Sequence, residues 1–385
     1  MKSEKKIFYQ AVFLSLLSFM FLVQGTEAQD FRIRGRLHMD VFYGINDADA
    51  FSSGFNNRRA RLGGGGTVAD KWDGRIEVDF ADGGVSPNDF RLRRSFENGG
   101  RLWIGQFKVP QGLNELTSSN EMSFIERSTP TNVIADARRM GIAYELFGST
   151  VGFKSMVFGR ALGQRGQLVD DMPLGIAFRG VFAPELGGGT LHAGASVVYE
   201  NLMDNNTVRF RDRPEARDSK GGSLRLIDAT VSEASSTLKA GFELLYINGP
   251  WSIEGEYLQV TVNRDNGDNG LNGVNGNNGD NPTFSGFHIQ TGYVLTGESR
   301  PYSKGSVGTI SPSGEKGAWE LLVRYSYMDL NDAGFTGGEQ SNITVGLNHY
   351  ITSRLRFMFN LVIVDVDYLE DLSPVLGVLR AQYNF

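Results

Sequence analysis

The sequence contains no cysteine and only 4 histidines in 385 residues. Without cysteine there can be neither a disulfide framework nor a thiolate metal site, so stability must come from a large folded unit. After residue 28 the chain has no long apolar run, which excludes a transmembrane helix in the mature protein. The formal net charge of −6 argues against a nucleic-acid-binding protein.

Residues 1–28 have the features of a secretory signal peptide. Lys2, Lys5 and Lys6 form a basic region, the run AVFLSLLSFMFLV supplies an apolar core of 13 residues, and Ala28 precedes the expected cleavage point. Thirteen apolar residues are too few to cross a bilayer core of ~30 Å, which argues against a membrane anchor. We therefore expect export by a cleaved signal peptide and one mature domain, residues 29–385.

Segments with alternating apolar and polar residues recur along the mature chain. A strand directs alternate side chains to opposite faces, so DFRIRGRLHMDVFYG (30–44) would carry apolar residues on one face and arginines on the other. The abundance of Gly (49), Phe (26) and Tyr (13) is also typical of many strands and turns. Sixteen candidate strands lie near 31–45, 58–69, 71–82, 88–97, 100–109, 139–147, 149–160, 174–184, 188–201, 236–248, 250–263, 284–298, 316–329, 339–350, 353–367 and 373–385.

The connections between these strands differ in length at the two ends. Alternate links are short, whereas the others are mostly long and include 110–138, 202–235 and 264–283; only 299–315 is long where a short turn is expected. A soluble sandwich or propeller would bury its apolar face in a packed core and would not need a polar inward face on every strand. The pattern predicts an all-β transmembrane antiparallel barrel of 16 strands, with short periplasmic turns, long external loops and an aqueous lumen.

Several sequence blocks resemble the phosphate-selective porin O and P family. They are GQFKVPQGLNELTSSNEMSFIERSTP (105–130), NNRRARLG (56–63), LHAGAS (191–196), RFRDRPEAR (209–217), LTGESRPY (295–302), GAWELLVRYS (317–326) and GLNHY (346–350), and they follow the family order. The resemblance implies a homotrimeric porin in the outer membrane of a Gram-negative bacterium. It also implies a third external loop folded into the lumen, with arginines leading from outside toward lysines near the constriction. The alternating C-terminal strand, ending in Phe385, is similar to the signal that barrel-assembly machinery reads.

The resemblance implies that Lys108 and Arg127 form a constriction pair that binds an oxyanion. Lys108 shares the parity of Gln106, opposite to Phe107 and Val109, and so is expected to face the lumen. For Arg127 an alternative stays open, in which it pairs with Glu126 or Glu121 and fixes the loop to the wall.

Other arginines are expected to line the lumen on the same alternation. Arg59 and Arg61 share one parity on the second strand and join the anion-binding set, and Arg91 and Arg93 form a similar pair on the fourth. Arg32, Arg34 and Arg36 would line the periplasmic side. Lumenal carboxylates are expected to offset part of this charge, namely Glu77, Asp79, Glu243, Glu254 and Glu256.

The RFRDRPEAR block places arginines at a regular spacing. Arg209, Arg211, Arg213 and Arg217 resemble the family's arginine ladder, in which planar guanidinium groups pass an anion along. The alternative is a solvated basic loop that pairs with lipopolysaccharide phosphates. Asp212, Glu215 and Asp218 would weaken the field there.

The sequence predicts a channel for facilitated diffusion of inorganic anions, namely phosphate, pyrophosphate or polyphosphate, in contact with outer-membrane lipid and lipopolysaccharide. The net negative charge does not exclude this, because selectivity depends on the charges that line the narrow part of a pore. A general diffusion porin of the same fold and a non-conducting binding or structural barrel are the alternatives. No enzyme, cofactor or metal site is predicted; the Asn- and Asp-rich run 263–281 lacks the spacing of a calcium loop and is expected to be a flexible loop.

Overall fold

The computed structural model describes residues 30–81, 83–162, 173–219, 224–264, 281–368 and 372–385. The expected signal peptide, residues 1–28, and most of the 263–281 run lie outside these ranges. In the described part of the chain, no helix is both long and apolar enough to cross a membrane.

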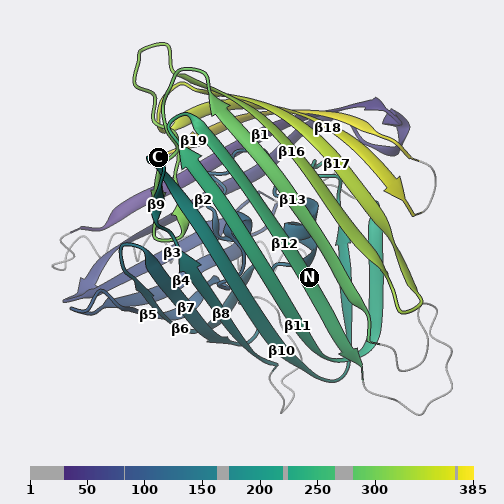
Figure 1. Cartoon of the computed structure of the whole chain (residues 1–385), viewed down its shortest axis with the longest axis horizontal. Helices are drawn as coiled ribbons and strands as arrows, with labels where there is room; N and C mark the ends of the chain where they lie inside the picture. Colours follow the sequence, from purple (N-terminus) through teal and green to yellow (C-terminus); the bar gives the residue numbers. More distant parts are fainter. Residues whose placement is uncertain (1–29, 82, 163–172, 220–223, 265–280, 369–371) are drawn as a thin grey trace, which may run out of the picture.

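Sixteen antiparallel strands form a closed barrel, as predicted (Figure 1). β1 pairs with β2 on one side and with the last strand, β19, on the other, which closes the ring. The wall strands are β1 (Arg32–Asn46), β2 (Gly54–Ala69), β3 (Trp72–Asp79), β4 (Ser86–Ser95), β5 (Arg101–Lys108), β6 (Arg138–Phe147), β7 (Val151–Phe158), β8 (Leu174–Phe182), β10 (Gly189–Asp212), β11 (Ile227–Asn248), β12 (Trp251–Arg264), β13 (Thr283–Val294), β16 (Ala318–Asp332), β17 (Phe335–Tyr350), β18 (Leu355–Asp367) and β19 (Val375–Asn384). The short β9 (Glu185–Leu186) pairs with the start of β10.

The predicted loop 202–235 is wrong in its bounds. β10 continues to Asp212 and β11 begins at Ile227, so the two strands form a long hairpin that ends in the segment 213–226. Phe210 pairs in register with Ala229, and both side chains are buried. Their packing inside the barrel favours strand continuation where the charged sequence alone indicated a loop.

β1 shows how the alternation is used. Ile33, Met39, Val41 and Tyr43 are exposed on the outer face, whereas Arg36, His38 and Asp40 are buried toward the interior. The outer apolar row is therefore available to lipid, and the inner row contributes charge to the lumen, as the sequence predicts.

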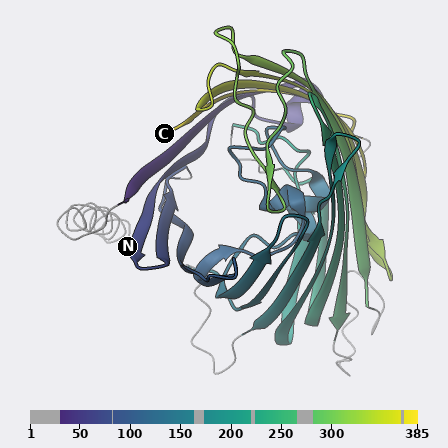
Figure 2. The ribbon, with the colours of Figure 1, turned by 60° about the vertical axis from the view of Figure 1, so that its left-hand side comes forward.

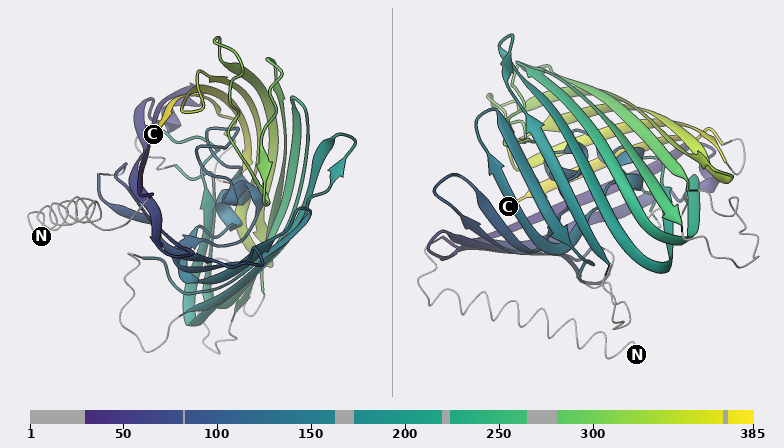
Figure 3. Two further views of the ribbon diagram at one scale, coloured as in Figure 1. Left: turned by 90° about the vertical axis from the view of Figure 1, so that its left-hand side faces the viewer. Right: turned by 60° about the horizontal axis from the view of Figure 1, so that its bottom comes forward.

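Three connecting segments fold into the barrel (Figure 2). The first, 109–137, contains α2 (Leu113–Leu116) and α3 (Thr129–Ile134), and its backbone amides donate to barrel side chains such as Glu256 and Asn360. The second is the hairpin tip between β10 and β11, of which residues 213–219 and 224–226 are described. The third, 295–317, carries β14 (Tyr302–Ser303) and β15 (Ser306–Val307) and enters from the opposite end of the barrel (Figure 3).

The inward face of the wall is not polar throughout, which corrects the expectation of a polar face on all strands. Leu258, Val260 and Val262 of β12 are buried on the inward side, where they join a cluster that includes Ile134 of α3 and Phe284. The inserted segments thus pack against a hydrophobic core on the β10–β19 side. The open part of the lumen is displaced toward β1–β7, where the cavities described next are found.

Candidate anion site in the lumen

A cavity of about 260 Å³ lies between β1–β7 and the inserted segment 109–137. We call it the basic cavity. Two carboxylates, Asp89 and Glu115, contribute to its wall, together with Trp103, Phe107, Leu116, Ser118 and Ser119. Nine cationic side chains line it: Arg36, Arg59, Arg61, Arg75, Arg91, Lys108, Arg127, Arg138 and Lys154.

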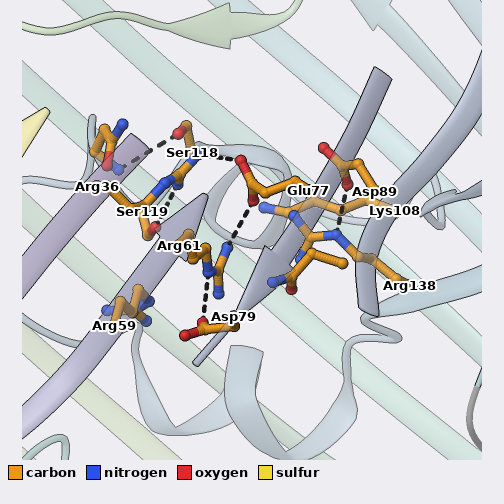
Figure 4. A network of polar contacts seen from close by, with 12 residues as sticks. Arg36, Arg59, Arg61, Glu77, Asp79, Asp89, Lys108, Ser118, Ser119 and Arg138 are labelled. Carbon is orange, nitrogen blue, oxygen red and sulfur yellow. Dashed lines mark hydrogen bonds and ion pairs between the residues drawn. The ribbon is translucent and has the colours of Figure 1, made fainter. Parts of the chain in front are cut away.

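The structure brings together all four residues predicted for the constriction. Lys108 and Arg127 enter from the side of the inserted segment, and Arg59 and Arg61 from β2 (Figure 4 labels Lys108, Arg59 and Arg61). Arg36 was expected on the periplasmic side with Arg32 and Arg34, but it lines the basic cavity as well. It donates to Ser119 Oγ and to Glu77 Oε2, each at 2.9 Å.

Lys108 lines the cavity as predicted, but the predicted alternation of β5 side chains is not the reason. Trp103 and Phe107, rather than Gln106, are the β5 side chains in the cavity wall, while Gln106 donates to the backbone of residues 87 and 88. Lys108 is the last residue of β5, and the chain turns inward after it. Its ammonium group then donates to the main-chain oxygens of Glu115 and Thr117.

Arg127 is held by the inserted segment itself. It donates to the main-chain oxygens of Asn114 (3.0 Å), Glu115 (3.1 Å) and Thr117 (2.9 Å), and its Nε lies 2.9 Å from Glu115 Oε2. Neither Glu126 nor Glu121 pairs with it in the structure. Arg127 therefore both lines the cavity and fixes the turn that follows α2.

Glu115 and Glu126 are the carboxylates of the inserted segment that face these cations. Burial alone would raise the pKa of Glu115, but the charges of Arg127 and Lys108 outweigh it and hold that pKa below its usual value. Burial likewise opposes ionisation of Glu126, whose pKa is nevertheless held well below its usual value by Arg58 and Arg59. Both side chains are therefore ionised at neutral pH.

Arg59 has a positive charge that is less compensated by carboxylates than the charge of its neighbour Arg58. Its nearest carboxylate oxygen, on Glu126, is 3.9 Å away, and its Nε has no hydrogen-bond partner among the described residues. Arg58, by contrast, donates to both oxygens of Glu126, at 2.5 and 2.8 Å. A register shift between β1 and β2 leaves Arg58 as an extra residue, so that two consecutive arginines face inward.

The remaining cations are arranged by carboxylates and aromatic rings. Glu77 lies 2.9 Å from Arg75. Glu77 also lies 3.4 Å from Arg61, and Asp89 lies 2.6 Å from Arg138 (Figure 4). The Trp103 ring faces Arg91 at 4.2 Å and Lys154 at 3.7 Å, measured to the ring centroid. Such cation–π contacts hold the charges in place without neutralising them.

A second cavity, also of about 260 Å³, adjoins the first and shares Arg75 and Arg91 with it. Arg32, Arg34 and Arg93 complete its five arginines, and Asp30, Asp73 and Glu77 provide the acids. The run Gly63–Gly66 of β2 forms part of its wall. Arg32 and Arg34 therefore lie beside a basic path that continues from the first cavity.

The arginines of the RFRDRPEAR block do not line either cavity. Arg209 forms an ion pair with Asp228 and is half-exposed, and Arg211 lies 4.0 Å from the same carboxylate. Arg213 is partly buried, and burial together with the charge of Arg225 lowers its pKa to about 10. Glu215 points into the barrel, where it pairs with Arg324.

Sequence reasoning missed Arg75, Arg138 and Lys154 as cavity residues. Arg75 shares its parity with Glu77 and Asp79, which were placed in the lumen, so the alternation could have found it. Lys154 shares its parity with Met156 and Phe158, and such an apolar row gives no signal of a polar lumenal face. Met156 and Phe158 are in fact buried, in a small cluster with Phe107.

The predicted lumenal acids all face inward. Glu243 pairs with Arg179, Glu254 lies 3.3 Å from His288, and Glu256 accepts from the Asn114 amide. Among the described residues, no group of His, Asp and Glu side chains is arranged to hold a metal ion.

Known proteins are similar to this chain in sequence and in fold. A sequence profile of the family described as phosphate-selective porin O and P matches residues 31–385. Porin O of Pseudomonas aeruginosa is 26% identical over 333 residues, which cover 78% of this chain and 73% of that protein.

Solved porins superpose on the barrel at low sequence identity. An anion-selective porin from Comamonas acidovorans has a TM-score of 0.58 at 15% identity, covering 92% of this chain and 99% of that one. The trimer form of OmpT, an outer-membrane protein of Vibrio cholerae, has a TM-score of 0.56 at 12% identity, with coverages of 92% and 99%. These two show the shared fold. With the profile match across the whole barrel, the chain belongs to the phosphate-selective porin O and P family and is an outer-membrane channel.

Proposed function

We propose that this channel passes inorganic anions, phosphate or pyrophosphate in particular, by facilitated diffusion. The observation that carries the proposal is the basic cavity, where nine cations and two carboxylates converge. A ring of arginine and lysine side chains at a narrow point favours anions whatever the net charge of the protein. Guanidinium and ammonium N–H groups can also replace part of an oxyanion's hydration shell.

The proposed route has three stages. Arg209, Arg211, Arg213 and Arg217 attract anions at the mouth formed by the long loops. Arg59 and Arg61 then provide N–H donors in the basic cavity, and Lys108 and Arg127 add their charge. Arg36 also lines the basic cavity, and Arg32 and Arg34 in the second cavity complete the path toward the periplasm. The shared Arg75 and Arg91 support a continuous basic path between the two cavities.

We also propose that the protein is a homotrimer, exported after removal of residues 1–28. β3, β5 and β7 have 8 residues each. At ~3.3 Å per residue and a tilt of ~45°, such a strand rises about 19 Å, less than the apolar band of ~25 Å. A neighbouring copy would cover this low part of the wall, and lipid and lipopolysaccharide would surround the rest. Chemical cross-linking and N-terminal sequencing of the purified protein test these two points.

The test of function is current through the purified protein in planar bilayers. A phosphate-selective channel gives a reversal potential that favours anions in a KCl gradient, and its chloride current is blocked by low phosphate. Current without anion preference would instead identify a general diffusion porin, which the carboxylates beside the cations make the second candidate. The absence of any current would favour a non-conducting barrel with a binding or structural role.

A variant tests the residues. Lys108→Glu reverses one charge in the basic cavity, so the net charge of the site falls by two units. The phosphate block should therefore weaken at least about tenfold. An unchanged block would show that the constriction assignment is wrong. Lys71→Glu, a matched charge reversal at a residue that pairs with Glu97 and lines neither cavity, serves as the control.

A further inference from the structure

Glu115 is the carboxylate that separates Lys108 from Arg127. Its Oε2 lies 2.9 Å from Arg127 Nε, and its Oε1 lies 3.4 Å from Lys108 Nζ. The side chain is buried and lines the basic cavity. A carboxylate bridging an arginine and a lysine presents two oxygens to the same donors that an oxyanion would use.

Main-chain oxygens also hold the two cations. Lys108 donates to the main-chain oxygens of Glu115 and Thr117, and Arg127 donates to those of Asn114, Glu115 and Thr117. The main chain thus holds both side chains. Removing the charge of Glu115 should therefore change the electrostatics of the cavity without moving Lys108 or Arg127.

We propose that Glu115 is a resident competitor for the permeating anion and sets how strongly the channel binds it. Its carboxylate occupies the place between Lys108 and Arg127, so that an incoming oxyanion has to displace it in order to contact them. It also cancels one of the positive charges in the cavity. Conduction requires binding that is strong enough for entry and weak enough for release, and Glu115 shifts the balance toward release.

This inference rests on the proposed anion passage and predicts a gain of affinity on substitution. Glu115→Gln keeps the side-chain length and an oxygen acceptor for Arg127 but removes the charge. A unit charge ~7 Å from a bound anion changes its affinity about threefold even at the dielectric constant of water, and more in a narrow lumen. The phosphate concentration that halves the chloride current should therefore fall at least about threefold, and the reversal potential should shift toward stronger anion preference.

The control is Glu243→Gln. Glu243 is also a buried carboxylate, paired with Arg179, but it lies outside the basic cavity. It should leave the half-blocking concentration and the reversal potential unchanged. In a Lys108→Met, Glu115→Gln double variant, the half-blocking phosphate concentration should return toward the wild-type value. This variant removes one positive and one negative charge, so the net charge of the cavity is that of the wild type.

The outcomes separate this inference from the proposed function. If the wild type is blocked by phosphate but Glu115→Gln leaves the block and the reversal potential unchanged, the role of Glu115 is wrong while the function stands. If the wild type is neither anion-selective nor blocked, the function fails, and the reversal potential of Glu115→Gln still decides whether Glu115 tunes the lumen. Equal shifts in Glu115→Gln and Glu243→Gln would also overturn the inference, because they would reflect only the total charge.

Discussion

Removing Glu215 should release two of the three inserted segments from the wall. Its carboxylate accepts from Arg324 of β16, Ser326 and Thr344, and from the backbone amide of Thr129 in α3. Glu215 thereby joins the hairpin tip 213–226, α3 and the barrel wall at one point. The pair is fully buried, with side-chain exposures of 1% for Arg324 and 0% for Glu215.

The cost of Glu215→Ala follows from the charge left behind. Arg324 would keep only the Glu126 main-chain oxygen and the Phe124 ring as partners, at 3.0 Å and 4.3 Å. An unpaired buried charge of this kind destabilises by about 3–5 kcal/mol. At 1.36 kcal/mol per tenfold change, the detached state becomes roughly a hundred to several thousand times more populated.

Limited trypsin digestion with mass spectrometry measures this detachment. Glu215→Ala should be cut at Arg217 or Arg225 much faster than the wild type, and its single-channel current should be noisier. Adding Arg324→Met should recover much of the resistance, because the unpaired charge is then removed. Asp228→Asn, which breaks the solvent-exposed pair with Arg209, should not change the digestion. Wild-type digestion and current in Glu215→Ala would refute the reasoning.

Three further predictions concern the lumen. Arg59→Gln should lower the anion preference and raise the half-blocking phosphate concentration roughly three- to tenfold, because Arg59 has the weakest compensation; an unchanged block would exclude it from the site. The difference in reversal potential between the wild type and Glu115→Gln should stay constant from about pH 7 to about pH 5, because Glu115, like Glu126, has a pKa below the usual ~4.3. The stabilisation from their ion pairs is complete above that usual value and is lost only as the pH falls through the lowered pKa, so a shift near pH 6 would contradict the assignment. Arg300→Met should cost about 3–5 kcal/mol, since it leaves the Glu320 carboxylate buried without its cation. It also removes the hydrogen bond to the Glu121 main-chain oxygen that ties segment 295–317 to segment 109–137, so open-channel noise should rise, and a current as quiet as that of the wild type would count against this link.

The wall of the barrel could be predicted from the sequence because the alternation that defines each strand involves only neighbouring residues. Alternation within each strand decides which side chains face lipid, so all sixteen strands were located, and β1 places its apolar and charged rows as expected. The two wall strands whose bounds were badly misjudged, β10 and β11, extend through charged sequence. Their extension depends on Phe210 and Ala229 packing in the interior, and that packing involves residues from distant strands.

The candidate site was predictable in its chemistry but not in its arrangement. Parity and family resemblance pointed to Lys108, Arg127, Arg59 and Arg61, and the structure gathers them in one cavity. Parity failed at β5, where the chain turns inward after Lys108, and at Arg58, where a register shift adds an inward residue. Neither feature leaves a periodic signal in the sequence.

The sequence by itself determined that this chain is a sixteen-stranded outer-membrane barrel with cations on its inner face, because strand periodicity acts over two residues. Only the tertiary structure decided which of these cations are paired with carboxylates and which can still attract an anion. Their counter-ions come from distant positions, as Asp40 does for Arg380 and Glu215 for Arg324, at separations of 340 and 109 residues. The field inside the lumen is the sum over such pairs, and it exists only once the inserted segments have folded against the wall.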